Sequence, residues 1–122
     1  MTPVSDIGGA AAGSHPRTRL DDNFSTPIRF SILASLGDGV ELDFATLAGV
    51  LQANDSVLSK AIAHLQDAGY VSTRKGYVGS RPRTWIRSTD AGQRAFTGHL
   101  GALREIVELG GGQLNWAPGA HT

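Results

Sequence analysis

The fold is decided by residues 43–71, which read DFATLAGVLQANDSVLSKAIAHLQDAGYV. Asp43 can cap a helix, and the apolar positions that follow it predict a short helix over 44–51. The turn at 52–55 holds Asn and Asp, either of which can cap a second helix over about 55–68, where apolar residues recur at helical spacing. The stretch therefore predicts two short helices joined by a tight turn.

On the amino-terminal side, Ser25-Thr26-Pro27 supplies an N-cap candidate followed by proline at a first helical position. Apolar residues then recur up to a glycine, which predicts a helix over 27–36. Asp38-Gly39 is a turn sequence. Residues 40–42 form a short extended piece that leads into the helix at 44–51.

On the carboxyl-terminal side, the periodicity changes from helical to extended. Residues 70–75 and 83–87 are β-branched and aromatic runs, and a glycine-bearing loop at 76–82 separates them. Two such runs predict a β-hairpin. Thr89-Asp90 then caps a last helix over about 91–109. The predicted order is α-(β)-α-α-β-β-α, a mainly α fold with a small β-hairpin (α+β).

The length of 122 residues is enough for one modest core. Residues 1–22 contain a Gly/Ala-rich stretch and few large apolar side chains, which predicts a flexible arm. Residues 23–109 form the predicted domain. Three glycines then end the helical pattern, so residues 110–122 are expected to form a flexible tail.

The composition excludes several kinds of site. The chain has no cysteine, so it cannot form disulfides or thiolate metal sites, and its four histidines lack metal-ligand spacing. We therefore expect no metal and no cofactor. Its apolar runs are too short to span a bilayer, and its N-terminus lacks the pattern of a secretory signal. The sequence thus predicts a cytoplasmic protein with no membrane partner.

The charges are unevenly distributed along the chain. The formal net charge is zero, yet residues 54–88 contain six bases and only two acids. The remainder carries the compensating negative charge. A domain with one basic surface that faces DNA would show such a division.

The joints between the predicted elements resemble those of a known family. Residues 43–48 and 58–71 resemble the helix-turn-helix of MarR-like winged helix transcriptional regulators, and residues 81–92 resemble the wing strand and the Thr-x-x-Gly start of the last helix. The match covers about 85 residues and is nearest to short, stand-alone winged helix regulators. The resemblance implies a dimeric, prokaryotic, sequence-specific repressor or activator of transcription that binds double-stranded DNA, and we expect a repressor.

Within this family, the resemblance implies that the helix at about 55–68 enters the major groove and that the wing at about 74–83 reaches the minor groove. The helix offers short polar donors and a cation on the face opposite its apolar stripe. The wing offers four cations beside flexible glycines. The predicted DNA-binding residues are Ser56, Ser59, Lys60, His64, Arg74, Lys75, Arg81 and Arg83.

The first and last helices carry more apolar residues than so small a domain is expected to bury, which predicts a homodimer on a pseudo-palindromic operator. The predicted dimerisation residues are Phe24, Ile28, Phe30, Phe96, Leu100, Leu103, Ile106 and Val107. The alternative is that these residues only complete the core of one protomer. A small-molecule effector of unknown identity is a further expectation from the family.

Other interpretations are open at this point. The polar helix face could be an ordinary solvated surface, and hairpins often carry Lys and Arg to protect an edge strand. The winged helix could also serve as a protein–protein interaction module, although its basic segment argues against this. An enzyme is not expected, because the sequence contains no nucleophile-base pair, metal cluster or phosphate loop.

Overall fold

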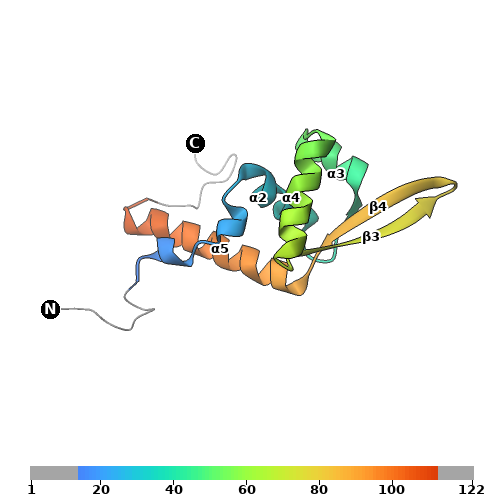
Figure 1. Cartoon of the computed structure of the whole chain (residues 1–122). Coiled ribbons are helices and arrows are strands. Elements are labelled where there is room, and N and C mark those ends of the chain that lie inside the picture. Colours follow the sequence, from blue (N-terminus) through green and yellow to red (C-terminus); the bar gives the residue numbers. More distant parts are fainter. Residues whose placement is uncertain (1–13, 113–122) are drawn as a thin grey trace, which may run out of the picture. The chain divides into compact units, whose positions relative to one another are not determined.

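The computed structural model describes residues 14–112. Residues 21–97 form one compact unit, and residues 14–20 with 98–112 belong to a second. The elements are η1 (Pro16–Arg19), η2 (Asp22–Phe24), α2 (Pro27–Leu36), β2 (Glu41–Asp43), α3 (Phe44–Leu51), α4 (Asp55–Asp67), β3 (Val71–Val78), β4 (Arg81–Ser88) and α5 (Asp90–Leu109). This order confirms the predicted mainly α winged helix-turn-helix fold (Figure 1).

The predicted caps explain where the helices begin. At the start of α2, the Thr26 hydroxyl accepts a hydrogen bond from the backbone N–H of Arg29 at 3.3 Å. At the start of α4, the Asn54 side chain accepts one from the N–H of Val57 at 2.9 Å. Each bond satisfies a donor that has no partner within its helix. The bounds of α2 and α3 are those that the sequence predicts.

A three-stranded antiparallel sheet has the order β2-β4-β3, so β4 is central. The hairpin of β3 and β4 extends beyond the helices (Figure 1). Val78 pairs with Arg81, which leaves Gly79 and Ser80 as a two-residue turn. The loop predicted at 76–82 is therefore wrong, because strand pairing continues almost to the tip. Gly79 has a φ of 65°, the left-handed conformation that such tight turns require.

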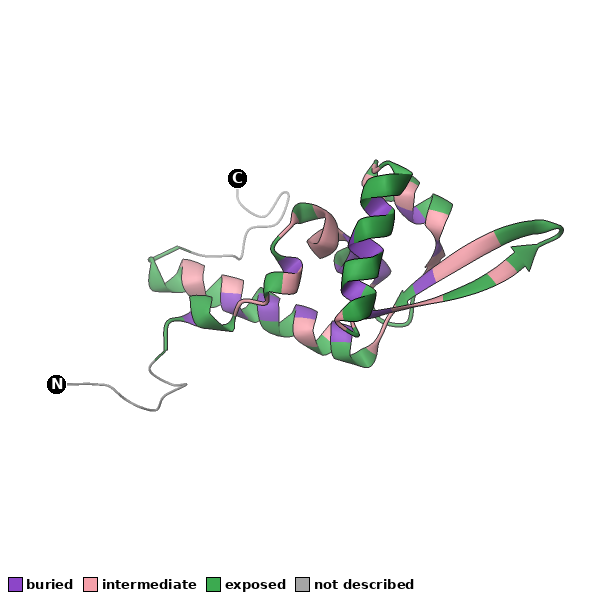
Figure 2. Ribbon diagram, viewed as in Figure 1, coloured by how far each residue is buried: buried purple, intermediate pink, exposed green. Residues whose placement is uncertain are grey.

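The core lies between α2, α3, α4 and the root of the sheet. Its fully buried side chains come from all four parts: Ile32, Leu33, Leu36, Leu47, Leu58, Leu65 and Ile86. In Figure 2, buried residues recur along the inner side of α4 and exposed residues along its outer side. One position of the predicted apolar stripe differs, since Val57 is 45% exposed.

Part of the predicted flexible arm is folded. Residues 16–24 contain η1 and η2, and the Tyr70 hydroxyl donates to the carboxylate of Asp21. Phe24 is buried and stacks on the Tyr70 ring with 5.5 Å between centroids. These contacts fasten η2 to the domain, which composition alone could not indicate. Residues 1–13 of the arm and residues 113–122 of the tail lie outside the described part of the chain.

Candidate nucleic-acid interface

The outer face of α4 presents the polar side chains that the sequence predicts. Ser56, Ser59 and Lys60 are all exposed. Gln66, near the end of the same helix, donates to the Thr73 hydroxyl on β3 at 3.3 Å. The exposed side of α4 is therefore joined to the root of the wing.

His64 has a partner within the domain. Its Nε2 atom lies 2.8 Å from the side-chain oxygen of Asn23 in η2. The backbone carbonyl of Asn23 in turn accepts from the Arg29 guanidinium at 2.8 Å. The structure thus places His64 in a polar contact between α4 and η2, whereas Ser59 and Lys60 occupy the open face.

The four predicted wing cations fall into two pairs with different surroundings. Lys75 and Arg81 are exposed on β3 and β4. Arg74 and Arg83 instead form ion pairs with acids of β2.

Arg74 contacts Glu41 through two hydrogen bonds. Its Nη2 and Nε atoms donate to the two carboxylate oxygens at 2.8 and 2.9 Å. Its guanidinium also lies 5.2 Å from the centre of the Trp85 ring, a cation–π distance. The hydrogen bond from Arg74 lowers the pKa of Glu41, and Glu41 raises the pKa of Arg74.

Arg83 contacts Asp43, which stands where β2 ends and α3 begins. The Arg83 Nη1 atom donates to the Asp43 carboxylate at 2.9 Å. The other carboxylate oxygen accepts from the Thr46 hydroxyl. Only 8% of the Asp43 side chain is exposed, against 36% for Arg83. The Thr46 hydrogen bond is the largest cause that lowers the pKa of Asp43, and the charge of Arg83 acts in the same direction. Asp43 therefore joins the helix-turn-helix to the wing.

A groove of about 350 Å³ lies between the start of α3 and the outer half of β4. It is lined by Asp43, Phe44, Ala45, Arg81, Pro82, Arg83 and Thr84. Arg81 is the exposed cation among these residues, since Arg83 is paired with Asp43. Among the described residues, Arg81 is thus an exposed and unneutralised cation beside the first turn of α3.

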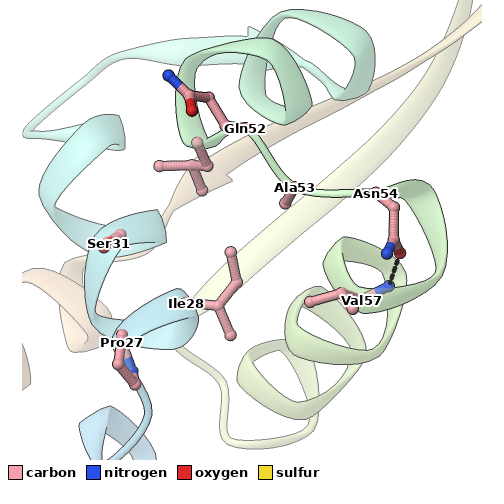
Figure 3. Close-up of a pocket in the computed structure, with 8 residues that line it drawn as sticks. Pro27, Ile28, Ser31, Gln52, Ala53, Asn54 and Val57 are labelled. Carbon is pink, nitrogen blue, oxygen red and sulfur yellow. Dashed lines mark hydrogen bonds between the residues drawn. The ribbon is translucent and has the colours of Figure 1, made fainter.

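A second groove, of about 370 Å³, lies beside the turn between α3 and α4 (Figure 3). Apolar atoms of Pro27, Ile28, Leu51, Ala53 and Val57 line it together with Ser31, Gln52 and Asn54. Gln52 has a φ of 53° and is the non-glycine residue with positive φ in the described part of the chain. The groove contains no charged side chain, and the predicted effector stays a prediction.

The predicted dimerisation residues divide between core and surface. Phe24 and Phe96 are buried and in edge-to-face contact at 5.4 Å, and Ile28 and Phe30 pack partly against the same core. Phe24 and Phe96 therefore complete the core of one protomer, as the alternative interpretation expects. On α5, Leu100 is 42% exposed, and Leu103, Ile106 and Val107 are half-buried. Among the predicted dimerisation residues, the exposed apolar surface is thus on α5, where Leu109 is also 68% exposed.

The sequence reasoning missed the two acids of β2. Glu41 and Asp43 lie outside the basic segment in sequence but pair with two of its cations in space. The available signal was that the two acids flank Leu42. Residues two apart on a strand share a face, so both acids would lie on the same face of the sheet.

Two negative findings concern residues 14–112. No helix in this range has both the length and the apolar character needed to cross a bilayer. The same range holds no group of three or more His, Cys, Asp or Glu side chains arranged to bind a metal ion.

Comparison with known proteins agrees with this geometry. A family model described as a winged helix DNA-binding domain matches residues 28–107. An uncharacterized protein of Methanocaldococcus jannaschii is 30% identical over 86 residues, which are 70% of this chain and 90% of that protein. The structure of a transcriptional regulator homologue from Pyrococcus horikoshii OT3 is similar with a TM-score of 0.66 and 26% identity, over 72% of this chain and 87% of that one.

The fold is also that of MarR-type regulators. Sco3205 from Streptomyces coelicolor, a MarR family transcriptional regulator solved in complex with DNA, superposes with a TM-score of 0.56 at 24% identity. The superposition covers 77% of this chain and 63% of that one. The matching family model is that of a DNA-binding domain, and the Pyrococcus horikoshii protein is a transcriptional regulator homologue. The chain belongs to the winged helix DNA-binding domain family and has the MarR-like fold of transcriptional regulators.

Proposed function

We propose that this protein is a sequence-specific regulator that binds double-stranded DNA as a homodimer, with α4 in the major groove and the wing in the minor groove. The observation that carries the proposal is the open face of α4, where Ser56, Ser59 and Lys60 are exposed beside a cationic hairpin. Short donors and a cation on a protruding helix can reach base edges, and wing cations can contact phosphates or the minor groove.

Within the proposed interface, the residues have different roles. Ser56, Ser59 and Lys60 read or approach the bases, while Lys75 and Arg81 supply the exposed charge of the wing. His64, Arg74 and Arg83 have partners inside the protein, which limits their availability to DNA. The proposed sign of regulation is repression, by occupation of a promoter site.

Fluorescence anisotropy tests the DNA-binding proposal. Purified protein is titrated against duplex DNA from upstream of its own gene and against a scrambled duplex, over a series of salt concentrations. We expect tight, salt-sensitive binding with a preference for the native duplex. Equal, weak binding to both duplexes would contradict sequence-specific recognition and favour a protein-binding winged helix.

Arg81→Ala tests the role of the wing in the same assay. Loss of one phosphate contact should weaken binding to every sequence and make the slope of log K against log salt shallower by about 0.9. Arg94→Ala is the matched control, because Arg94 is an exposed arginine on α5. An equal effect of both substitutions would mean that only net charge matters.

The homodimer is proposed to form through the exposed apolar side chains of α5. Leu100, Leu103 and Val107 are spaced at i, i+3 and i+7, so they share one face of α5, and a partner would remove this face from water. Sedimentation at micromolar concentration should give a dimer, and Leu100→Glu should give a folded monomer. A wild-type protein that sediments as a monomer would refute this part of the proposal.

A further inference from the structure

We propose that Glu41 competes with DNA phosphate for Arg74, so that this wing cation is withheld from the duplex. The inference deepens the proposed function and rests on it. Of the three exposed wing cations, Lys75 and Arg81 then contact DNA, whereas Arg74 stays bound to Glu41. Glu41 then regulates nonspecific affinity from outside the contact surface.

The geometry of the pair occupies the donors that a phosphate would need. Both carboxylate oxygens of Glu41 accept from Arg74, at 2.8 and 2.9 Å. Two parallel bonds of this kind are the arrangement in which arginine binds a carboxylate or a phosphate most strongly. A phosphate that approaches Arg74 must therefore displace a ligand of the same charge and similar geometry.

The surroundings hold the guanidinium close to the sheet. Arg74 lies over Trp85, its direct partner in the strand register. Two residues further along β3, Gly76 leaves the space that this arrangement needs. A Cβ added there would lie 3.3 Å from the Arg74 Nη1 atom and 3.6 Å from the Trp85 Nε1 atom. The wing thus carries a glycine where a side chain would crowd the retained arginine.

The carboxylate is held in place by the sheet itself. Glu41 pairs with Arg87 across β2 and β4, and Arg87 is two residues from Trp85 on the central strand. Glu41, Arg74, Trp85 and Arg87 therefore share one face of the sheet. Arg87 also lowers the pKa of Glu41 through its charge. Glu41 is flanked by two cations, Arg74 on β3 and Arg87 on β4. Its carboxylate therefore remains ionised and near Arg74 at neutral pH.

The ion pair has a definite consequence for binding. A paired arginine presents little net charge to a phosphate and releases no counterion when DNA binds. The Glu41 side chain is 31% exposed and that of Arg74 is 58% exposed, so the pair is open to water. Pairs of this kind are weak in the free energy of folding. Removal of Glu41 should therefore release Arg74 without unfolding the domain.

A double-mutant cycle in the full-length chain tests this inference. The variants are Arg74→Ala, Glu41→Gln, Glu41→Ala and the double variant Glu41→Gln with Arg74→Ala. Each is titrated by anisotropy against one short random-sequence duplex over a salt series. Thermal unfolding of every variant checks that the domain is folded.

We expect the Glu41 substitutions to raise affinity for DNA only when Arg74 is present. Arg74→Ala alone leaves the salt slope unchanged, because the cation was not in contact with DNA, and lowers affinity only modestly at low salt, because the Glu41 carboxylate is left without its partner. Glu41→Gln and Glu41→Ala raise affinity severalfold and steepen the slope by about 0.9, the value for one added phosphate contact. The double variant returns both quantities to the wild-type values. A gain of this kind cannot arise from partial unfolding.

Asp38→Asn is the control for charge alone. It makes the same change in net charge at an exposed turn before β2. An equal gain in this variant would overturn the inference, as would unchanged binding after both Glu41 substitutions. A loss of affinity with a shallower slope in Arg74→Ala would show that Arg74 already contacts DNA. Failure of the wild-type protein to bind any duplex would instead overturn the proposed function, before any variant is compared.

Discussion

The first turn of α5 lies against the backbone carbonyl of Tyr70: a Cβ added at Gly92 would be 2.1 Å from the Tyr70 oxygen. The same carbonyl accepts a hydrogen bond from the backbone N–H of Thr89 at 3.0 Å. The Thr89 hydroxyl accepts from the Gly92 N–H at 3.0 Å and donates to the carbonyl of Gly69 at 2.6 Å. The Thr-x-x-Gly sequence is therefore a packing motif that fastens α5 to the end of α4.

Gly92→Ala should destabilise the domain by about 2–3 kcal/mol, because the new methyl group can only be accommodated if the backbone of α5 or of Tyr70 moves. Gly98→Ala is the matched control on the same helix, with no heavy atom within 4 Å of the added Cβ. There, the better helix propensity of alanine should raise stability by up to about 1 kcal/mol. Chemical denaturation measures both, and a similar effect of the two substitutions would contradict the packing explanation.

Gln52→Gly should stabilise the protein by about 1 kcal/mol. Gln52 adopts φ 53° and ψ 43°, a left-handed conformation that is strained for a residue with a side chain. Gln52→Ala keeps the Cβ and thus the strain, so it should bring no gain. If alanine stabilises as much as glycine, the side chain of Gln52 rather than its backbone is the cause.

Thr46→Val should lower the stability of the protein at neutral pH and make its further loss of stability on acidification smaller. The Thr46 hydroxyl is the largest cause that holds the pKa of Asp43 below its ordinary value of 3.8. Because the folded-state pKa is depressed, the stabilisation from ionised Asp43 is present above that ordinary value and is lost as the pH falls through the folded-state pKa. Without the hydroxyl, the folded-state pKa rises toward the ordinary value, so Asp43 contributes less stability at neutral pH, and the loss of that contribution on acidification is smaller and complete at a higher pH.

Thermal unfolding between neutral pH and about pH 2 measures this shift. Thr46→Ser keeps the hydroxyl and should retain the wild-type profile. Coincident profiles for valine and wild type would show that the Thr46 contact does not influence Asp43.

Ser59→Ala and Lys60→Ala should reduce discrimination between the operator and random DNA by about 1–3 kcal/mol if either side chain contacts a base edge. Both residues lie on the exposed face of α4, away from the buried Leu58. The measurement is the ratio of affinities for the two duplexes at one salt concentration. Equal losses on both duplexes would indicate contact with the DNA backbone only.

The helices were predictable because their signals are local. The Thr26 and Asn54 caps, the proline at the start of α2 and the apolar spacing of α4 each act within a few residues. The exposed position of Val57 was not predictable, since it depends on the groove that Ile28 and the α3–α4 turn form beside it.

The wing cations show what local reasoning cannot supply. A count of charges over residues 54–88 treats Arg74 and Arg83 as available. Their partners, Glu41 and Asp43, are between 33 and 40 residues away in sequence and become neighbours only when β2 pairs with β4. Likewise, the hydrogen bond between Tyr70 and Asp21 connects positions 49 apart, so the folding of η2 could not be inferred from composition.

The central place of β4 in the sheet limits how this wing could be exchanged between relatives. A chimaera that received residues 74–85 on a scaffold without acids at positions 41 and 43 would gain two unneutralised arginines together with the hairpin. Its affinity for any polyanion would rise, whatever sequence the transplanted tip prefers. Specificity in this architecture therefore depends on β2 as well as on the hairpin. A unit that can be transferred between relatives would have to begin at β2.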